Sequence, residues 1–297
     1  MRIGRYHHRR KEYYGILNRQ SFTSLPDLAK RLGKKLPSRL EDFIALGSQS
    51  LDIAEELQTS IKDDNIADLS VPKSGVSLLA PLAIPPKIIC LGLNYLDHAA
   101  ETRKTVPKEP IIFMKPRTAI IGPREKIIKP KFVRELDYEG ELAVIIGKKA
   151  KNVTSAEAEK YIFGYTIFND VSAREIQFGD KQWTRGKSFD TFAPIGPWIL
   201  TKDQMPNVGN LAIRTWVNGE LRQDSSTKNM AFRVGEIVHH LSRVMTLEPC
   251  DVIATGTPAG VGFAMTPPKF LKHGDVVRIE IEGIGVLENE VTEAGED

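Results

Sequence analysis

The sequence predicts an α+β fold in which a strand-rich, rolled or sandwiched mixed sheet follows a small N-terminal α/β domain. From Ile88 onward, segments rich in β-branched and aromatic residues greatly outnumber helical patterns. These segments do not alternate with helices, which argues against a doubly wound parallel sheet. The proline-rich stretch at residues 69–87 is typical of a linker. We therefore expect an N-terminal domain at 1–75 and a larger domain at 76–297.

The N-terminal segment mixes short strand and helix patterns. YYGILN, at 13–18, has the composition of a strand, and residues 25–33 and 39–61 are helix-like. Arg9, Arg10 and Lys11 are expected in a solvated turn between two short strands. No chemical motif is found before residue 75.

The remaining chain is organised as strands with few helices. Asn218-Gly219, inside LAIRTWVNGEL, predicts a tight β-hairpin. Helices are expected near 97–104, at 154–161 after the cap residue Thr154, near 171–178 and at 234–244. Strands are expected in the segments 87–95, 141–147, 161–170, 197–201, 211–221, 251–257 and 276–291.

Composition excludes several classes of protein. The 297 residues carry 41 basic and 38 acidic side chains, a net charge of +3, and only 7% aromatic residues, which argues against nucleic-acid binding. The N-terminus lacks an apolar signal core, and the longest apolar stretch is cut by prolines and a lysine, so we expect a cytoplasmic protein without a membrane helix. Cys90 and Cys250 are expected as reduced, buried thiols. The sequence also lacks the P-loop, G-x-G-x-x-G, G-x-S-x-G and H-E-x-x-H patterns.

Three carboxylates lie at strand ends. In LDYEGELAVIIG, residues 136–147, strand alternation places Glu139 and Glu141 on a face that turns apolar further along. Asp170 ends another apolar strand. Such an oxygen-only set suits Mg²⁺ or Mn²⁺. The alternatives are an exposed acidic sheet edge for the glutamates and a helix N-cap for Asp170.

A second group is GLNYLDHAAETRK. His98 and Glu101 are three residues apart, so on a helix the carboxylate can orient the imidazole as a general base. The alternative is an incidental pair on a surface helix.

Cationic and small residues complete the candidate site. Lys115, Arg174, Gln177 and Lys187 would suit an anionic substrate, although isolated lysines are mostly solvated and Lys187 stands in a polar turn without signs of core packing. Thr257 lies on the glycine-rich turn ATGTPAGVG, whose backbone N–H groups can hold an oxyanion or carboxylate. A tight turn without a ligand is the alternative.

Taken in order, these segments resemble the fumarylacetoacetate hydrolase family. Its motifs are G-x-N-Y-x-x-H-x-x-E, F-x-K-P, D-Y-E-x-E, N-D-x-x-A-R, K-S-x-D and G-T-P-x-G-V-G. They stand here at residues 92–101, 113–116, 137–141, 169–174, 187–190 and 256–262. The first 75 residues match only loosely.

The resemblance implies roles for individual residues. Glu139, Glu141 and Asp170 are expected to bind Mg²⁺ or Mn²⁺. His98, Glu101 and Lys187 are expected to be catalytic, with the first two on a lid segment. Lys115, Arg174, Gln177 and Thr257 are expected to contact the substrate.

The resemblance also implies a fold, an assembly and a reaction. The fold is the family's mixed β-sandwich roll, and the assembly is a homodimer. The expected reaction is hydrolysis of a carbon–carbon bond in a β-diketo acid of the acylpyruvate type, an anionic 2-oxo acid, through an enolate stabilised by the metal. Alternatives within the family are oxaloacetate decarboxylation and isomerisation or hydration of 2-hydroxy-dienoates, such as 2-hydroxyhepta-2,4-diene-1,7-dioate. A binding protein without turnover is a more distant alternative, since every expected ligand and the dyad are present.

Overall fold

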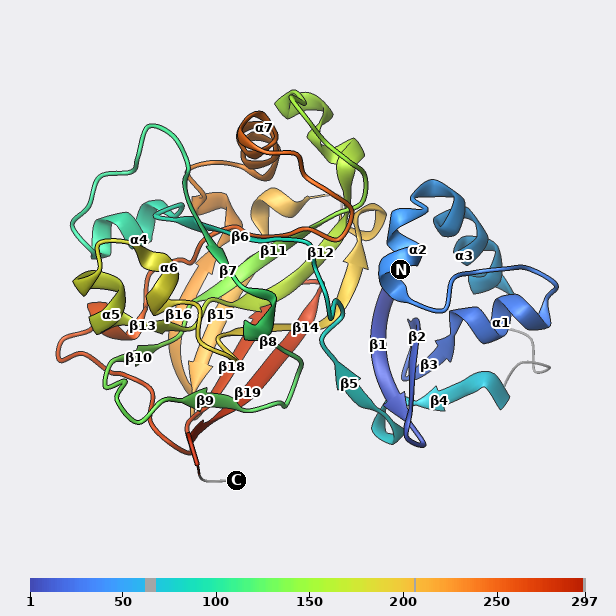
Figure 1. Cartoon of the computed structure of the whole chain (residues 1–297), viewed down its shortest axis with the longest axis horizontal. Helices are drawn as coiled ribbons and strands as arrows, with labels where there is room; N and C mark the ends of the chain where they lie inside the picture. The colour runs from blue at the N-terminus through green and yellow to red at the C-terminus, as the bar shows by residue number, and fades with distance from the viewer. Residues whose placement is uncertain (62–67, 206, 296–297) are drawn as a thin grey trace.

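The structure is a computed structural model that describes residues 1–61, 68–205 and 207–295. Two large sheets dominate it, and helices cover their outer faces and one end (Figure 1). Parallel pairs, such as β17 (Val252–Ala254) with β6 (Ile88–Gly92), occur among mainly antiparallel ones. The strand-rich α+β class and the mixed sheet are therefore confirmed.

The larger sheet has twelve strands among the described residues. Its centre is β14 (Ala193–Thr201), β12 (Ile162–Asn169) and β11 (Gly140–Ile146), followed by β17, β6 and β7 (Ile111–Lys115). On the other side of β14 the N-terminal strands continue the sheet, through β1 (Arg2–His8), β2 (Lys11–Asn18), β3 (Ser21–Ser24) and β4 (Ser70–Pro72). β5 (Ser77–Leu79) pairs with β1, and β8 (Ile120–Ile121) pairs with β14. The expected turn between β1 and β2 is found at Arg9 and Arg10, both with positive φ.

The second sheet packs against the first. It runs β16 (Glu220–Ser226), β15 (Ala212–Val217), β18 (Val276–Ile281), β19 (Gly285–Glu293) and β9 (Ile127–Lys129). β15 and β16 form the hairpin expected at Asn218-Gly219, where both residues have positive φ. β15, β18 and β19 contact β11, β12 and β14, which makes the sandwich. A separate pair joins β10 (Leu136–Asp137) to β13 (Ser172–Ala173).

The side chains of β11 alternate between two cores. Leu142, Val144 and Ile146 pack into the core between the sheets, whereas Ala143 and Ile145 pack into the core that the N-terminal helices share. The alternation predicted from the sequence is therefore confirmed, and both faces of this strand are buried.

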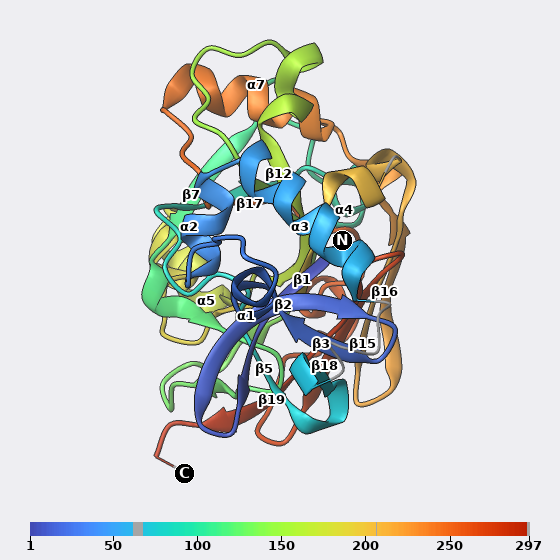
Figure 2. The ribbon, with the colours of Figure 1, turned by 90° about the vertical axis from the view of Figure 1, so that its right-hand side faces the viewer.

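Seven α-helices lie in the described residues. α1 (Leu25–Arg31), α2 (Leu40–Ala45) and α3 (Ser48–Ser60) gather beside β1 and β2, as the turned view in Figure 2 shows. α1 begins where Ser24 accepts a hydrogen bond from Asp27 N. The others are α4 (Leu96–Glu101), α5 (Arg174–Gly179), α6 (Trp183–Gly186) and α7 (Val234–Val244). None of the described helices has the length and apolar character needed to cross a membrane.

Three local expectations are corrected. Residues 155–161 form a 3₁₀-helix, and Thr154 donates its hydroxyl to Glu157 at 2.8 Å without capping the backbone. The strand expected at 136–147 is interrupted at Tyr138 and Glu139, between β10 and β11. The helix expected near 171–178 begins at Arg174 with Ala173 as its N-cap, so Asp170 is not a helix cap.

Candidate active site

The three carboxylates of the predicted metal site meet because β11 and β12 are antiparallel. Gly140 pairs with Asn169, so the start of one strand lies beside the end of the other. Asp170 N donates to Glu139 O at 2.9 Å. Glu139 is 6% exposed, and Glu141 and Asp170 are fully buried. The alternative of an exposed acidic edge is therefore wrong, since β11 lies between β12 and β17.

The donor set fits a small divalent cation. One oxygen from each of Glu139, Glu141 and Asp170 lies within 4.8 Å of the others. Glu141 Oε2 accepts from Gly256 N at 2.8 Å, while the buried Oε1 has no hydrogen-bond partner in the described part of the chain. A buried carboxylate oxygen without a partner is costly. A hard cation would satisfy it, so the residues present fit Mg²⁺ or Mn²⁺.

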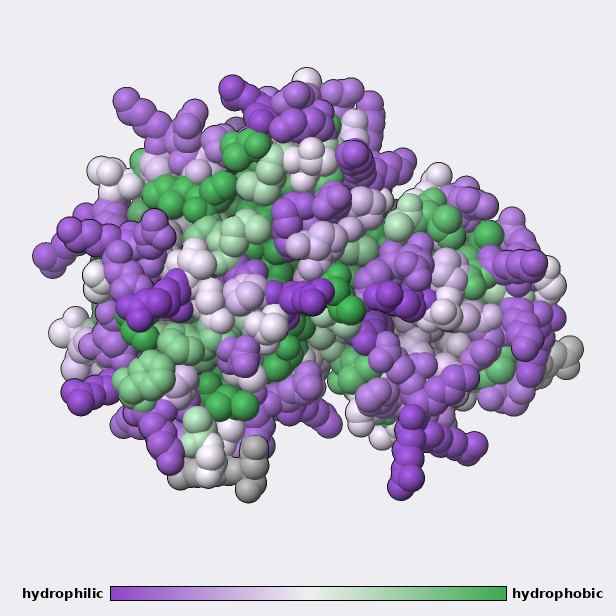
Figure 3. Space-filling model, viewed as in Figure 1, coloured by the Kyte–Doolittle hydropathy of each residue, from purple (hydrophilic) through white to green (hydrophobic). Residues whose placement is uncertain are grey.

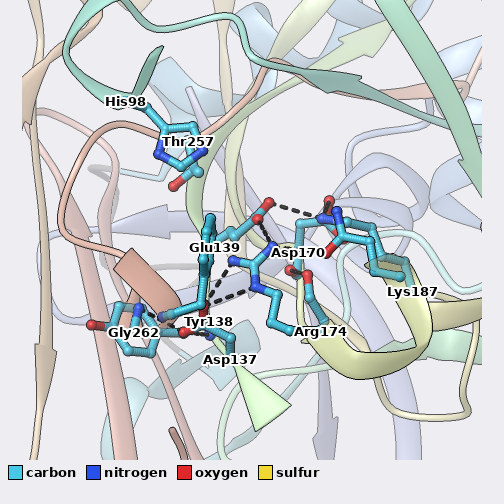
Figure 4. Close-up of polar contacts among 12 residues, drawn as sticks. His98, Asp137, Tyr138, Glu139, Asp170, Arg174, Lys187, Thr257 and Gly262 are labelled. Atoms are coloured by element: carbon cyan, nitrogen blue, oxygen red, sulfur yellow. Dashed lines mark hydrogen bonds and ion pairs between the residues drawn. The ribbon is translucent and has the colours of Figure 1, made fainter. Parts of the chain in front are cut away.

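Two buried ammonium groups contact carboxylates of this cluster, and Figure 4 shows the one that belongs to Lys187. Lys187 Nζ lies 2.9 Å from Glu139 Oε2 and 2.7 Å from Asp170 Oδ2. Lys115 Nζ contacts Asp170 Oδ1 and donates to Val171 O at 3.0 Å. Lys187 is 1% exposed and lies over the ring of Phe113. The expectation that Lys187 stands in a solvated turn is wrong, because its partners come from two strand ends distant in sequence.

The pKa values of Glu139 and Glu141 are shifted in opposite directions. Burial opposes ionisation of Glu139, but Lys187 and Arg174 hold its pKa down to about 2. Burial, with the charges of Asp170 and Glu139, raises the pKa of Glu141 well above its usual range. A cation among the three carboxylates would offset this repulsion.

Arg174 connects the carboxylates to the rest of the site. Its Nη1 lies 2.6 Å from Glu139 Oε1 and donates to Gln177 Oε1 at 2.9 Å. Its Nε donates to Asp137 Oδ2 at 2.9 Å. Asp137 is fully buried and had been given no role from the sequence. Arg174 is thus held rigidly, and Gln177 keeps its amide nitrogen available as a donor.

His98 and Glu101 are in contact as expected. His98 Nδ1 lies 3.3 Å from Glu101 Oε2, and His98 is 7% exposed, so the pair is not incidental to a solvated surface. Glu101 Oε1 in turn accepts from Gly260 N at 2.9 Å. With its Nδ1 proton donated to Glu101, the imidazole keeps a basic Nε2.

The glycine-rich turn at residues 256–263 holds carboxylates of the protein itself. Its N–H groups donate to Glu141 from Gly256, to Glu101 from Gly260, and to Asp137 from Gly262 and Phe263. Gly260 has φ of +101°, and a Cβ there would lie 1.9 Å from a backbone oxygen. These four N–H groups are occupied by carboxylates of the protein itself, so they are not free to hold an oxyanion or carboxylate of a ligand.

Thr257 is fixed within this turn. Its hydroxyl donates to Gly140 O at 3.0 Å and accepts from Gln223 Nε2 at 2.8 Å. Gln223 Oε1 accepts from Gly140 N at 3.0 Å. Gln223, from β16 of the second sheet, therefore joins the turn to the start of β11. The sequence carries no motif that would have identified it.

The predicted residues gather around one small cavity of about 30 Å³, enough for a water molecule or two. Glu101 and Asp170 stand behind the lining and contact it through His98 and Lys187, whereas Lys115 and Glu141 lie deeper, Lys115 in contact with Asp170 and Glu141 with the backbone of Gly256. Lys104 lines it with aromatic side chains that were not predicted, Phe113, Phe178, Trp183 and Phe263. The predicted residues that line it directly are His98, Glu139, Arg174, Gln177, Lys187 and Thr257.

Comparisons with known proteins agree with this geometry. Residues 87–292 match the family described as fumarylacetoacetate (FAA) hydrolase C-terminal. The Xenopus laevis protein named oxaloacetate tautomerase fahd2, mitochondrial, is 47% identical over 258 residues, which cover 86% of this chain and 79% of the relative.

Two solved structures share the architecture. A 2-hydroxyhepta-2,4-diene-1,7-dioate isomerase from Mycobacterium marinum has a TM-score of 0.77 at 36% identity, with all of both chains covered. A fumarylacetoacetate hydrolase from Exiguobacterium antarcticum has a TM-score of 0.84 at 37% identity, covering 99% of this chain and 100% of that one. With six motifs in order and a match over residues 87–292, the chain belongs to the fumarylacetoacetate hydrolase family.

Proposed function

We propose that the protein is an Mg²⁺- or Mn²⁺-dependent enzyme that interconverts the keto and enol forms of oxaloacetate. The observation that carries this proposal is His98, a base oriented by Glu101, on the same cavity as the carboxylate cluster. Tautomerisation needs one group that moves a proton and one that accepts charge at the 2-oxo oxygen. The name of the Xenopus relative supports the choice of oxaloacetate.

The residues of the chain divide the reaction between them. His98 Nε2 removes a proton from C3, and Glu101 stabilises the imidazolium that forms. Gln177 donates to the substrate carboxylate, and Lys187 stabilises the negative charge that develops on the 2-oxo oxygen. The proton then returns to that oxygen, which gives the enol. When bound, the divalent ion supplies an electrophile for the same oxygen.

The reaction can be tested directly. The enol form of oxaloacetate absorbs in the ultraviolet, so its decay to the keto form can be followed with Mg²⁺ and catalytic amounts of enzyme. We expect the rate to rise in proportion to enzyme concentration and to fall after treatment with a chelator. A rate equal to the buffer rate would reject the proposal.

Carbon–carbon bond hydrolysis is the second candidate. The same oriented imidazole can deprotonate water, and the Exiguobacterium structure carries the name of a hydrolase. An acylpyruvate would then yield pyruvate and a carboxylic acid. Assays with acetylpyruvate and with a 2-hydroxy-dienoate, beside oxaloacetate, will rank the reactions by kcat/KM.

Replacing Glu141 with glutamine separates metal binding from folding. No cation contacts Glu141 within the described residues, so the change breaks no ion pair, and the amide oxygen can still accept from Gly256 N. We expect the metal-free thermal midpoint to move little. We expect the Kd for Mg²⁺, from calorimetry, to rise at least about tenfold, because even indirect ligand partners are worth that much.

Glu290→Gln on β19 is the matched control, since Glu290 lies on an exposed strand position. It should leave the Mg²⁺ affinity unchanged. Equal Mg²⁺ affinity of the Glu141 variant and the unmodified protein would remove Glu141 from the metal site.

A further inference from the structure

Lys104 is the one cation of the cavity lining that has no acidic partner in the described part of the chain. It follows α4, and its backbone N–H donates to Ala99 O at 2.9 Å. Its exposed side chain reaches the cavity, with Nζ 5.8 Å from the centre of the Phe178 ring. By contrast, Arg174 and Lys187 are both held by buried carboxylates.

Aromatic contacts connect Lys104 to the buried carboxylates. The ring of Phe178 contacts that of Phe263, with centroids 5.3 Å apart. Phe263 in turn lies under the guanidinium of Arg174, at 4.5 Å. Arg174 contacts Glu139. Lys104 therefore stands at the outer end of a row of aromatic side chains, whose inner end contacts Arg174 and, through it, Glu139 of the carboxylate cluster.

The net charge of the buried cluster around the metal site can be balanced by one substrate carboxylate. The buried cluster holds four carboxylates and three cations, so a divalent ion would leave it with a single positive charge. Its members are Asp137, Glu139, Glu141 and Asp170 with Lys115, Arg174 and Lys187. A second carboxylate on the substrate would need a further cation, because an unpaired charge is costly at a partly buried site.

We propose that Lys104 binds the distal carboxylate of the substrate and so selects dicarboxylic 2-oxo acids over neutral or monocarboxylic ones. This inference rests on the proposed function, which places the 2-oxo acid end of the substrate at the metal site. It adds the residue that distinguishes oxaloacetate from an acylpyruvate. The ammonium itself lies over the Phe178 ring, a cation–π contact that orients it and leaves its N–H groups available to a ligand carboxylate.

The kinetic test compares oxaloacetate with its 4-amide, 2-oxosuccinamate, which has the same shape without the distal charge. We expect Lys104→Met to raise KM for oxaloacetate about three- to fivefold, the upper part of the range for an ion pair near the surface. KM for the amide should stay within about a factor of two. Lys104→Arg should keep the preference, and added salt should raise KM for oxaloacetate less in the methionine variant than in the unmodified enzyme.

Lys108→Met is the control, since Lys108 is an exposed lysine on the same loop. It should change neither KM. An equal effect of Lys104→Met on the two substrates, or no effect on either, would overturn the assignment.

A binding measurement keeps this test independent of turnover. Calorimetry with malate and its 4-amide, in the presence of Mg²⁺, should show tighter binding of malate by the unmodified protein and loss of that difference in Lys104→Met. Absence of a preference for malate overturns the role of Lys104, even if the enzyme acts on oxaloacetate. A preference for malate without tautomerase activity rejects the proposed reaction and retains the role of Lys104.

Discussion

Replacing His98 with alanine is expected to lower kcat by about 10²–10⁴, the usual contribution of a positioned general base. The imidazole lines the cavity and is oriented by Glu101, while neither residue is among the carboxylates that fit the metal. Mg²⁺ affinity should therefore be unchanged. Stopped-flow or steady-state kinetics of the keto–enol reaction, with calorimetric titration of Mg²⁺, will measure both quantities.

The same substitution at His240, on α7, is the control and should leave kcat unchanged. Decarboxylation of oxaloacetate offers a second comparison, because it needs an electron sink and no base. Any decarboxylation that the unmodified protein catalyses should be retained in the His98 variant. Unmodified keto–enol activity in that variant would leave His98 as a residue of the cavity wall without a catalytic role.

Replacing Lys187 with methionine is expected to lower both activity and the stability of the metal-free protein. The ammonium pairs with Glu139 and Asp170, and all three groups are buried. Removing one partner of a buried ion pair costs about 3–5 kcal/mol. For a chain of this size that corresponds to a fall in thermal midpoint of about 5–8 °C, measured by calorimetric scans in a chelator.

Added Mg²⁺ should recover much of this loss of stability, because a cation again neutralises the carboxylates. It should not recover kcat, since the charge that faces the developing enolate is absent. Lys149→Met, at an exposed position, is the matched control and should change neither quantity. If the metal-free midpoint of Lys187→Met equals that of the unmodified protein, the buried ion pairs contribute nothing to stability.

Site residues could be predicted from the sequence where the pattern that marks them lies within a few consecutive residues. Glu139, Glu141 and Asp170 could be identified because alternation and strand ends are written in a few consecutive residues, and two adjacent antiparallel strands then bring them together. Asp137 shares that alternating face, so the same pattern could have identified it. Its partners, the N–H groups of Gly262 and Phe263, had no sequence signal linking them to it.

Long-range pairing was beyond the sequence patterns. A lysine in a polar stretch is normally solvated, and the burial of Lys187 follows only from partners 17 and 48 positions away. β1 pairs with β14, with Arg2 opposite Leu200, so the N-terminal strands extend the central sheet. The domain boundary at residue 75, the homodimer and the cytoplasmic location remain predictions.

Figure 3 shows how hydrophilic and hydrophobic residues are distributed over one face of the molecule. Hydrophilic side chains surround the rim of this face, and apolar side chains gather in patches nearer its middle (Figure 3). Phe178 is 45% exposed, so the row of aromatic side chains that begins at Lys104 reaches the surface. Movement of α5 and α6, which carry Phe178 and Trp183, would widen a cavity that is now too small for oxaloacetate.

The turn at residues 256–263 limits which parts of the site can be changed one at a time. Because this one run of backbone holds Glu141, Glu101 and Asp137 at once, a mutation in it disturbs several tasks together. Such pleiotropy confines viable change to segments that reach the cavity independently, such as the loop that carries Lys104 and the helices that carry Phe178 and Trp183. A change of substrate preference should therefore be easier to engineer through those segments than through the turn.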